Sequence, residues 1–404
     1  MVMKRFGTLF IMGILLFACR QPEIDRFIDF DSFLPSAQST KPVFTPDGSL
    51  NPEMLIPDSP NSSSASKVIT ASARDLISAI SSNHLTQVSG TYTGHDLDGT
   101  PITLSGKLIY PAKGRIKNII LISHYAVCAE YEAPSESFPI EGIFAARGYA
   151  LVIADYIGYG VTADRIHPFM HVESTARSVT DFALAAKPYL ESVGRKPESD
   201  EVILLGYSQG ASISMGVLDI IQKEYQSELP VKKVYLGGGP YDLEATCEIA
   251  INEDKTSIPC AIPMIVQGMN VGERLGLDLG HFFKPRLLDN YQEWINSKKY
   301  TIDQIKEQMG DAPLHKFITD ACRDKNNPVT VMFYEALARN STLNIKPKAP
   351  MLVYHSRNDD MIPFRNALEA EVAYKADNVT FDFGNYGDHF TAGVHFLRVV
   401  FFDL

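Results

Sequence analysis

The residues whose types and spacing most directly suggest chemistry form Gly206-Tyr207-Ser208-Gln209-Gly210, a G-x-S-x-G pattern. An apolar run over 202–205 precedes it, and a helix-compatible segment over 211–221 follows it. A serine between a strand and a helix must adopt a strained backbone conformation, and small residues two positions away let neighbouring backbones approach that turn. Such a turn exposes the serine hydroxyl, so the pattern predicts that Ser208 is a nucleophile.

A serine nucleophile needs a base and an acid that orients the base, and after such a turn they follow in the chain order serine, carboxylate, histidine. A predicted buried strand over 351–355 runs into a turn that contains Asp359 and Asp360, before Pro363 opens a helix. We favour Asp359 as the acid because it lies four residues before Pro363. Asp360 remains the alternative, because neighbouring residues in a turn point in different directions.

The predicted base is His389, which follows a last predicted strand over 379–383 and a loop rich in glycine and asparagine. A histidine on a loop beyond the final strand can reach both the serine and the acid. His395 lies among apolar residues and is predicted to pack in the terminal helix, while His355 is predicted to make a structural hydrogen bond at a strand end. Asp388 is predicted to cap the helix that begins at His389.

Acyl transfer also needs two donors for the oxyanion that forms in the tetrahedral intermediate. The first expected donor is the backbone N–H of Gln209, behind the nucleophile. The second is expected from the loop after the predicted strand over 116–123, where Tyr125 or Ala126 would supply the N–H. The alternative role for the preceding His124 is that of a side chain that anchors this loop.

These residues must be positioned by an alternating series of strands and helices. The sequence predicts a hairpin, with strands over 88–93 and 102–110, and then strands near 117–123, 149–155, 201–207 and 231–237. Helices are predicted near 136–147 and 172–192. This alternation predicts an α/β fold with a mostly parallel central sheet and helices on both faces.

The next predicted strand begins only at Met351, so a long insertion separates the two halves of the predicted sheet. The insertion, residues 242–345, carries helix signals: a capping-box pair, Thr301 and Gln304, and Pro328 at a predicted helix start. We interpret it as a helical cap on an α/β core formed by 67–241 and 346–404. Its aromatic residues could line an acyl pocket, but packing within the cap is the favoured role for Phe282, Phe283, Tyr291 and Trp294.

From the G-x-S-x-G turn, the strand order and the triad order, residues 85–404 resemble an α/β-hydrolase. Within that superfamily the chain is similar to secretory lipases of the fungal lipase A type and their bacterial relatives. The segments that carry this finer resemblance are 133–135 (APS), 148–149 (GY), 155–160 (DYIGYG), 167–169 (HPF) and 206–210 (GYSQG). The resemblance implies ester hydrolysis through Ser208, Asp359 and His389, under a helical cap. It gives the segment 155–160 no catalytic role, and we expect that segment to shape a surface loop.

The N-terminus has the features of an export signal. Lys4 and Arg5 precede an apolar run of about 12 residues, too short to span a bilayer. The run meets Leu16-Phe17-Ala18-Cys19, which resembles a bacterial lipobox, in which the signal is cut before the cysteine and the cysteine is acylated. We therefore expect a signal peptide over 1–18, a lipid on Cys19, a flexible tether over 19–66 and a place in the bacterial cell envelope. Ordinary secretion is the alternative.

Composition narrows the possible partners. The net charge is −11 and the pI is about 5.4, with no basic cluster beyond the signal, which argues against nucleic acid as a partner. No cysteine or histidine pattern suggests a metal, and no cofactor is expected. Cys247 and Cys260 are expected to form the most plausible local disulfide in an oxidising compartment. The sequence does not specify the oligomeric state.

Together these features predict an envelope-anchored serine hydrolase that cleaves small or lipid-like carboxylic esters through an acyl-enzyme. Two alternatives are open. The first is a serine peptidase with the same triad. The second is a lipoprotein that binds a ligand without catalysis.

Overall fold

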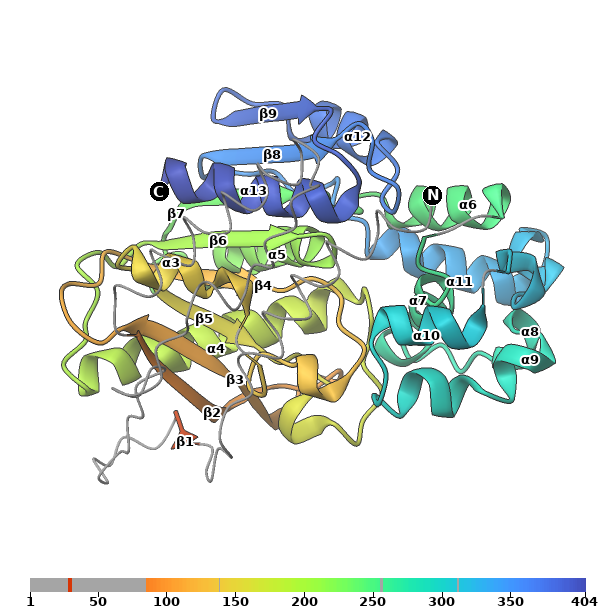
Figure 1. Cartoon of the computed structure of the whole chain (residues 1–404), viewed down its shortest axis with the longest axis horizontal. Coiled ribbons are helices and arrows are strands. Elements are labelled where there is room, and N and C mark those ends of the chain that lie inside the picture. The colour runs from red at the N-terminus through yellow and green to blue at the C-terminus, as the bar shows by residue number, and fades with distance from the viewer. Residues whose placement is uncertain (1–27, 31–84, 138, 255–256, 311) are drawn as a thin grey trace, which may run out of the picture.

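The computed structural model describes residues 28–30, 85–137, 139–254, 257–310 and 312–404. Their centre is a nine-stranded sheet with the order β1-β2-β3-β5-β4-β6-β7-β8-β9 (Figure 1). The strands are β1 (Ile28–Asp29), β2 (Leu85–His95), β3 (Pro101–Pro111), β4 (Ile119–Ser123), β5 (Ala150–Ala154), β6 (Val202–Tyr207), β7 (Val231–Gly237), β8 (Met351–Ser356) and β9 (Val379–Gly384). The six strands from β5 to β9 in this order pair in parallel, whereas the β2–β3 hairpin and the β3–β5 pair are antiparallel. The structure thus has the predicted, mostly parallel sheet.

Helices cover both faces of this sheet because the central strands are apolar on both sides. Leu121, Val152 and Leu204 pack with residues of α4 (Val172–Ser192), α5 (Gln209–Ile220) and α12 (Arg365–Tyr374). Their neighbours in the strands point the opposite way, and pack with α3 (Ile143–Ala146) and α13 (His389–Asp403). The helix predicted near 136–147 is shorter than expected: the described part consists of a 3-10 turn over Ile140–Gly142 and α3.

A short N-terminal strand closes one edge of the sheet. β1 pairs in parallel with β2, and the next residue, Phe30, is fully buried against the rings of Phe182 and Tyr189, each at 5.0 Å between centroids. Gly90 makes this approach possible, because a Cβ there would lie 2.3 Å from the Ile28 carbonyl oxygen. Residues 28–30 belong to the predicted tether. The rest of the tether and the predicted signal peptide with Cys19 lie outside the described residues.

The helical segments between β7 and β8 form a group beside the sheet (Figure 1). They are α6 (Leu243–Glu253), α7 (Ala261–Gly272), α8 (Leu279–Phe282), α9 (Pro285–Leu288), a π-helical turn (Gln292–Asn296), α10 (Ile302–Met309), the 3-10 turns Leu314–Lys316 and Asp320–Arg323, and α11 (Pro328–Arg339). Thr301 and Gln304 form the capping box at the start of α10, and Pro328 is the first residue of α11. This group, which we call the cap, has its own apolar core.

Lys298 fastens the cap to the loops above the sheet. Its Nζ donates hydrogen bonds to the carbonyl oxygens of Ala163 and Arg165, both at 2.5 Å. Its own carbonyl accepts the N–H of Glu130, and the Glu130 carboxylate accepts the N–H of Gly160. Burial lowers the pKa of Lys298 to about 8.

Among the described residues, no helix is both long and apolar enough to cross a membrane.

Candidate active site

Ser208 lies at the sharp turn that joins β6 to α5. Its backbone has φ 57° and ψ −126°, and a residue with a Cβ rarely adopts such a positive φ. The strain is held by the sheet, because the Ser208 N–H donates to the Gly237 carbonyl of the neighbouring β7 at 2.9 Å. Such strain commonly marks a functional residue. The side chain is half-buried.

Close contacts with neighbouring backbone atoms require glycine at both Gly206 and Gly210. A Cβ at Gly206 would lie 2.0 Å from the Gly210 carbonyl oxygen, so the strand and the helix could not meet across the turn. A Cβ at Gly210 would lie 1.9 Å from the carbonyl oxygen of Ser123, the last residue of β4. The turn is therefore packed directly against the β4 strand end, from which the loop with Tyr125 and Ala126 begins.

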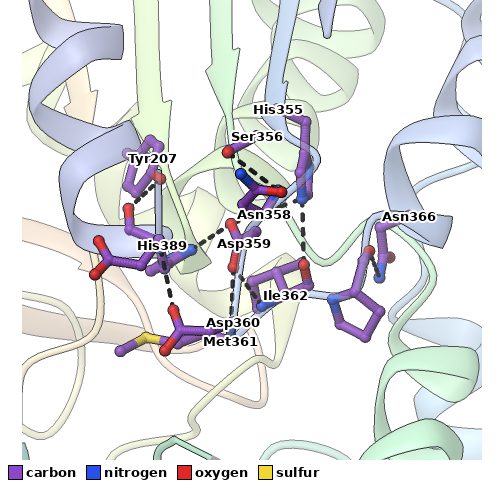
Figure 2. Close-up of polar contacts among 12 residues, drawn as sticks. Tyr207, His355, Ser356, Asn358, Asp359, Asp360, Met361, Ile362, Asn366 and His389 are labelled. Carbon is purple, nitrogen blue, oxygen red and sulfur yellow. Dashed lines mark hydrogen bonds and ion pairs between the residues drawn. The ribbon is translucent and has the colours of Figure 1, made fainter. Parts of the chain in front are cut away.

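Asp359 and His389 lie together beyond the ends of β8 and β9 (Figure 2). The His389 Nδ1 is 2.7 Å from the Asp359 Oδ2, and the Asp359 side chain is fully buried. The other carboxylate oxygen of Asp359 accepts the N–H groups of Met361 and Ile362 at 3.0 and 2.8 Å. Burial by itself raises the pKa of Asp359, but the hydrogen bond and charge of His389 outweigh burial and hold it below its usual value. Asp359 is thus an ionised acceptor for the imidazole.

Asp360 also contacts His389, but in a different way. Its Oδ1 accepts the backbone N–H of His389 at 3.1 Å, and its Oδ2 accepts the Ser257 hydroxyl at 2.9 Å. Asp360 therefore holds the start of α13, whereas Asp359 holds the imidazole ring. Asp388 caps α13 as predicted, since its side chain accepts the Thr391 N–H at 2.9 Å.

The two other histidines near this pair have structural contacts. The His355 Nε2 is 3.2 Å from the Ile362 carbonyl oxygen and 3.6 Å from Asp359 Oδ2, and burial lowers the pKa of His355. His395 packs in α13, where its Nδ1 is 2.9 Å from the Tyr354 hydroxyl. These contacts agree with the roles that the sequence suggested for both.

Tyr207, the residue before the serine, connects the turn to His389. Its hydroxyl donates to the His389 carbonyl at 2.5 Å, and the two rings lie 5.0 Å apart between centroids (Figure 2). Within the described part of the chain, no hydrogen bond joins the Ser208 hydroxyl to the His389 ring. Catalytic hydrogen bonds of this kind are often long without substrate and tighten when it binds.

The loop after β4 is fixed by His124. The His124 Nδ1 is 2.7 Å from the Tyr125 carbonyl oxygen, and its ring stacks on Tyr156 at 3.9 Å between centroids. Burial lowers the pKa of His124 to about 4, so the ring is neutral at pH 7. Because a trans peptide directs its C=O and N–H to opposite sides, the Ala126 N–H points away from His124. Gln209 is the first residue of α5, so its N–H has no acceptor within the helix.

The segment 155–160 is buried, which corrects the expectation of a surface loop. The Asp155 carboxylate accepts the Ser105 hydroxyl at 2.5 Å and the Ser135 N–H at 2.8 Å. Five of the six residues of the segment are buried. Burial raises the pKa of Asp155. Asp155 therefore ties β3 to the loop after β4 and supports the site from below.

A narrow cavity separates the cap from the core. Its volume is about 20 Å³. Its walls are mostly apolar and aromatic: Cys128, Tyr159, Ile166, His167, Phe169, Met264, Tyr291, Ile295, Asn296 and Lys298. The Nε2 of His167, which lines the cavity, is 3.5 Å from the side-chain nitrogen of Gln209, the residue that follows Ser208.

The cap aromatics divide between this cavity and the cap's own core. Phe282 and Phe283 are 0% and 1% exposed and pack inside the cap, and Trp294 packs against that core. Only Tyr291 of the four lines the cavity. The packing role favoured from the sequence therefore describes most of them.

The structure does not contain the disulfide expected between Cys247 and Cys260: all four described cysteines, Cys128, Cys247, Cys260 and Cys322, are free buried thiols. Cys247 lies in α6 near Tyr334 of α11, whereas Cys260 precedes α7 and faces the core near Tyr159. Both belong to the cap's apolar core, but they contact different helices. Sequence distance alone suggested the wrong pairing.

Residues 131–396 match the secretory lipase family, which is most of the chain. The chain belongs to the secretory lipase family. Membership supports a hydrolase of the lipase or esterase kind and a secreted protein. The matched residues include the serine turn, the cap, Asp359 and His389.

Solved structures show the same fold. A putative hydrolase from Legionella pneumophila superposes with a TM-score of 0.71 at 22% identity, over 80% of this chain and 88% of that chain. The rice cell wall degrading esterase LipA from Xanthomonas oryzae gives 0.67 at 22% identity, over 83% and 91%. Candida antarctica lipase A gives 0.59 at 17% identity, over 76% and 73%. These neighbours confirm the α/β-hydrolase fold. No curated protein matches the sequence.

Three site residues had no role assigned from the sequence: Tyr207, His167 and Lys298. A role for Tyr207 in the site could have been predicted, because the residue before the nucleophile must lie beside the end of the next strand. His167 was noted only as part of the family resemblance. No local sequence pattern indicated that Lys298 would be buried, because its burial depends on how the cap folds.

Proposed function

We propose that this secretory lipase is a serine hydrolase that cleaves carboxylic esters through an acyl-enzyme, with Ser208, Asp359 and His389 as its triad. One observation carries the proposal: a strained serine turn stands beside a histidine whose Nδ1 is held by a buried carboxylate at 2.7 Å. This is the arrangement in which a histidine can accept a proton from serine and return it to a leaving group. Family membership supports the same chemistry.

In this mechanism the His389 Nε2 takes the proton of the Ser208 hydroxyl as its oxygen attacks the ester carbonyl. Asp359 stabilises the imidazolium and keeps the proton of the neutral ring on Nδ1. The backbone N–H of Gln209, together with that of Tyr125 or Ala126, stabilises the oxyanion. The orientation of the Tyr125 carbonyl toward His124 favours Ala126 as the second donor. Water then attacks the acyl-enzyme, with His389 as base, and releases the acid.

The cavity beneath the cap is the proposed acyl site. Its apolar walls suit an alkyl or aromatic acyl group, but a cavity of about 20 Å³ has room for little more than one water molecule, so the cap must move for an acyl chain to enter. One lining residue, His167, contacts the side chain of Gln209, whose backbone N–H is the proposed oxyanion donor. Esters of short acids, which need the smallest movement of the cap, are therefore the expected substrates.

The direct test compares ester turnover by the wild type and Ser208→Ala. Hydrolysis of 4-nitrophenyl acetate and butyrate should fall by at least about 10³-fold in the variant, since the nucleophile is removed. Thermal melting of both proteins shows whether the fold is retained. Faster turnover of peptide amides than of esters would show that the protein is a serine peptidase instead. Absence of all turnover in the folded wild type would favour the alternative of a lipoprotein that binds a ligand without catalysis.

We further propose that the protein is held at the cell envelope by a lipid on Cys19. The support is the sequence Leu16-Phe17-Ala18-Cys19 after the apolar run, together with membership of a secreted family. Growth with a fatty-acid analogue should label the wild type but not Cys19→Ser. Equal labelling of the two proteins would exclude acylation at Cys19.

A further inference from the structure

Two cysteines from distant parts of the chain meet between the core and the cap. Cys128 lies in the loop after β4, close behind Tyr125 and Ala126, and Cys260 is the residue that precedes α7 in the cap. The Cys260 side chain is the largest cause of the raised pKa of the Cys128 thiol, ahead of burial. In the structure both are free thiols, 2% and 0% exposed.

Independent contacts fix the same geometry. The Cys128 sulfur lies 3.5 Å from the sulfur of Met264, and the Met264 N–H donates to the Cys260 carbonyl at 2.9 Å. Cys260 and Met264 are therefore one helical turn apart and belong to the same face of α7. Tyr159 from the core and Tyr291 from the cap line the cavity with Cys128, and burial together with both thiols raises the pKa of each tyrosine. Both cysteines therefore lie where the cap meets the core.

The other two described cysteines have different surroundings. Cys322 donates to the Phe282 carbonyl at 3.5 Å, and both Cys322 and Cys247 lie near Tyr334. Among the described cysteines, Cys128 is the one whose sulfur contacts α7, the helix that begins directly after Cys260. These two residues are the pair placed for a disulfide.

We propose that Cys128 and Cys260 form a disulfide bond in the exported protein, and that this bond fastens the oxyanion loop to the cap. A secreted protein folds in a compartment where disulfides form and persist. The oxidant is a disulfide-carrying oxidoreductase. One thiolate attacks its disulfide to give a mixed disulfide, and the second thiolate displaces the enzyme sulfur. The chain is oxidised to the disulfide, and the oxidoreductase leaves as a dithiol.

The bond would close a loop of about 130 residues, which includes β5, α4, β6, α5, β7 and α6. Long loops gain the largest stabilisation from a crosslink in the chain-entropy account. The bond would also fix one wall of the cavity, because Cys128 and Met264 both line it. The cap could then move only about this point.

Peptide mapping of the wild-type protein tests the bond without any substitution. The full chain is exported to the periplasm, purified without reductant, alkylated under denaturing conditions, digested and analysed by mass spectrometry. We expect a reducible crosslinked peptide that contains Cys128 and Cys260, with Cys247 and Cys322 alkylated. Alkylation of both Cys128 and Cys260, or pairing of either with another cysteine, would overturn the proposal. This result does not depend on whether the protein hydrolyses esters.

Thermal melting with matched variants gives a second measurement. Reductant should lower the Tm of the wild type by roughly 5–10 °C. Cys128→Ala and Cys260→Ala should each remove this sensitivity, and the double variant should melt close to the single variants because both remove one bond. Cys247→Ala, from the same cap core, is the control and should keep the sensitivity. A wild-type Tm unaffected by reductant, or a Cys128→Ala protein that keeps the full response, would contradict the bond.

Discussion

At the scale of single residues, two adjacent carboxylates contact His389 but do different things. Asp359 accepts from the imidazole, whereas Asp360 accepts from the backbone N–H of the same residue. Asp359→Asn should therefore lower kcat for ester hydrolysis by on the order of 10³–10⁴-fold, because the ring loses its ionised partner and its tautomer. Asp360→Asn keeps an oxygen acceptor for the backbone N–H and should lower kcat by less than about 10-fold.

The adjacent aspartates serve as each other's control, since both substitutions have the same size and remove the same charge. Steady-state kinetics at a saturating ester concentration, with circular dichroism to check the fold, makes the comparison. A larger loss in Asp360→Asn than in Asp359→Asn would reverse our assignment of the acid.

His124 gives a pH prediction at the same scale. Burial lowers its pKa to about 4 in the folded protein, whereas an unfolded histidine has a pKa of about 6.5. Between these values the unfolded chain binds a proton that the folded one excludes, so the free energy of unfolding falls as the pH drops from about 6.5 to about 4. His124→Phe keeps a ring against Tyr156 but cannot titrate. Over this range the wild type should lose on the order of 3 kcal/mol relative to that variant.

Urea unfolding of the two proteins at several pH values measures this difference. Buried histidines whose pKa His124 does not affect, such as His355, are present in both proteins, so their contributions cancel in the comparison. Parallel stability curves for wild type and His124→Phe would show that His124 is protonated as readily in the folded state as in the unfolded one.

At the scale of elements, the short strand β1 should contribute more stability than its length suggests. Phe30 is fully buried between Phe182 and Tyr189, so Phe30→Ala should lower the free energy of unfolding by about 3–5 kcal/mol. Val372→Ala is a suitable control because Val372 is 82% exposed, and it should change stability by less than about 0.5 kcal/mol. Chemical denaturation measures both. Equal stability of Phe30→Ala and wild type would mean that β1 does not hold the edge of the sheet in solution.

The elements of the core were largely predictable because their sequence signals are local. The apolar run before Gly206 predicts a buried strand, and the glycines around Ser208 predict a close approach that the structure requires. The capping pair Thr301 and Gln304 likewise predicts a helix start from two side chains. The segment 155–160 was misjudged because the resemblance to related hydrolases suggested a surface loop, and no local pattern indicated that the segment is buried.

Long-range contacts of the site could not be predicted in the same way. The choice between Asp359 and Asp360 depends on how the turn after β8 meets α13, which no local pattern specifies. The cysteine pairing failed for a related reason: Cys260 is near Cys247 in the chain, but in space it lies one helical turn from Met264, whose sulfur contacts Cys128. Such contacts are set by the packing of the cap on the core.

At the scale of the whole molecule, the cavity between the cap and the core should set acyl specificity. Tyr291 and Met264 narrow it, so Tyr291→Leu and Met264→Ala should enlarge it and admit longer chains. Each should raise the ratio of kcat/KM for octanoate over butyrate esters by about 10-fold or more, since each buried methylene contributes roughly 0.8 kcal/mol. A panel of 4-nitrophenyl esters measures the ratio.

Phe282→Leu is the matched control in the same cap. Phe282 is fully buried in the cap core and does not line the cavity, so this change should lower stability without shifting the ratio. If kcat/KM falls equally for all acyl chain lengths in the Tyr291→Leu and Met264→Ala variants, the cap has a structural role and does not set acyl specificity.

The central claim is that Ser208 is the nucleophile of a working triad, and covalent labelling tests it most directly. The folded wild type is treated with a fluorophosphonate, digested, and mapped by mass spectrometry. We expect one phosphonylated peptide, with the adduct on Ser208, formed by the native but not by the heat-denatured protein, and lost in Ser208→Ala. An adduct on another residue, or no adduct on a folded wild-type protein, would contradict the account.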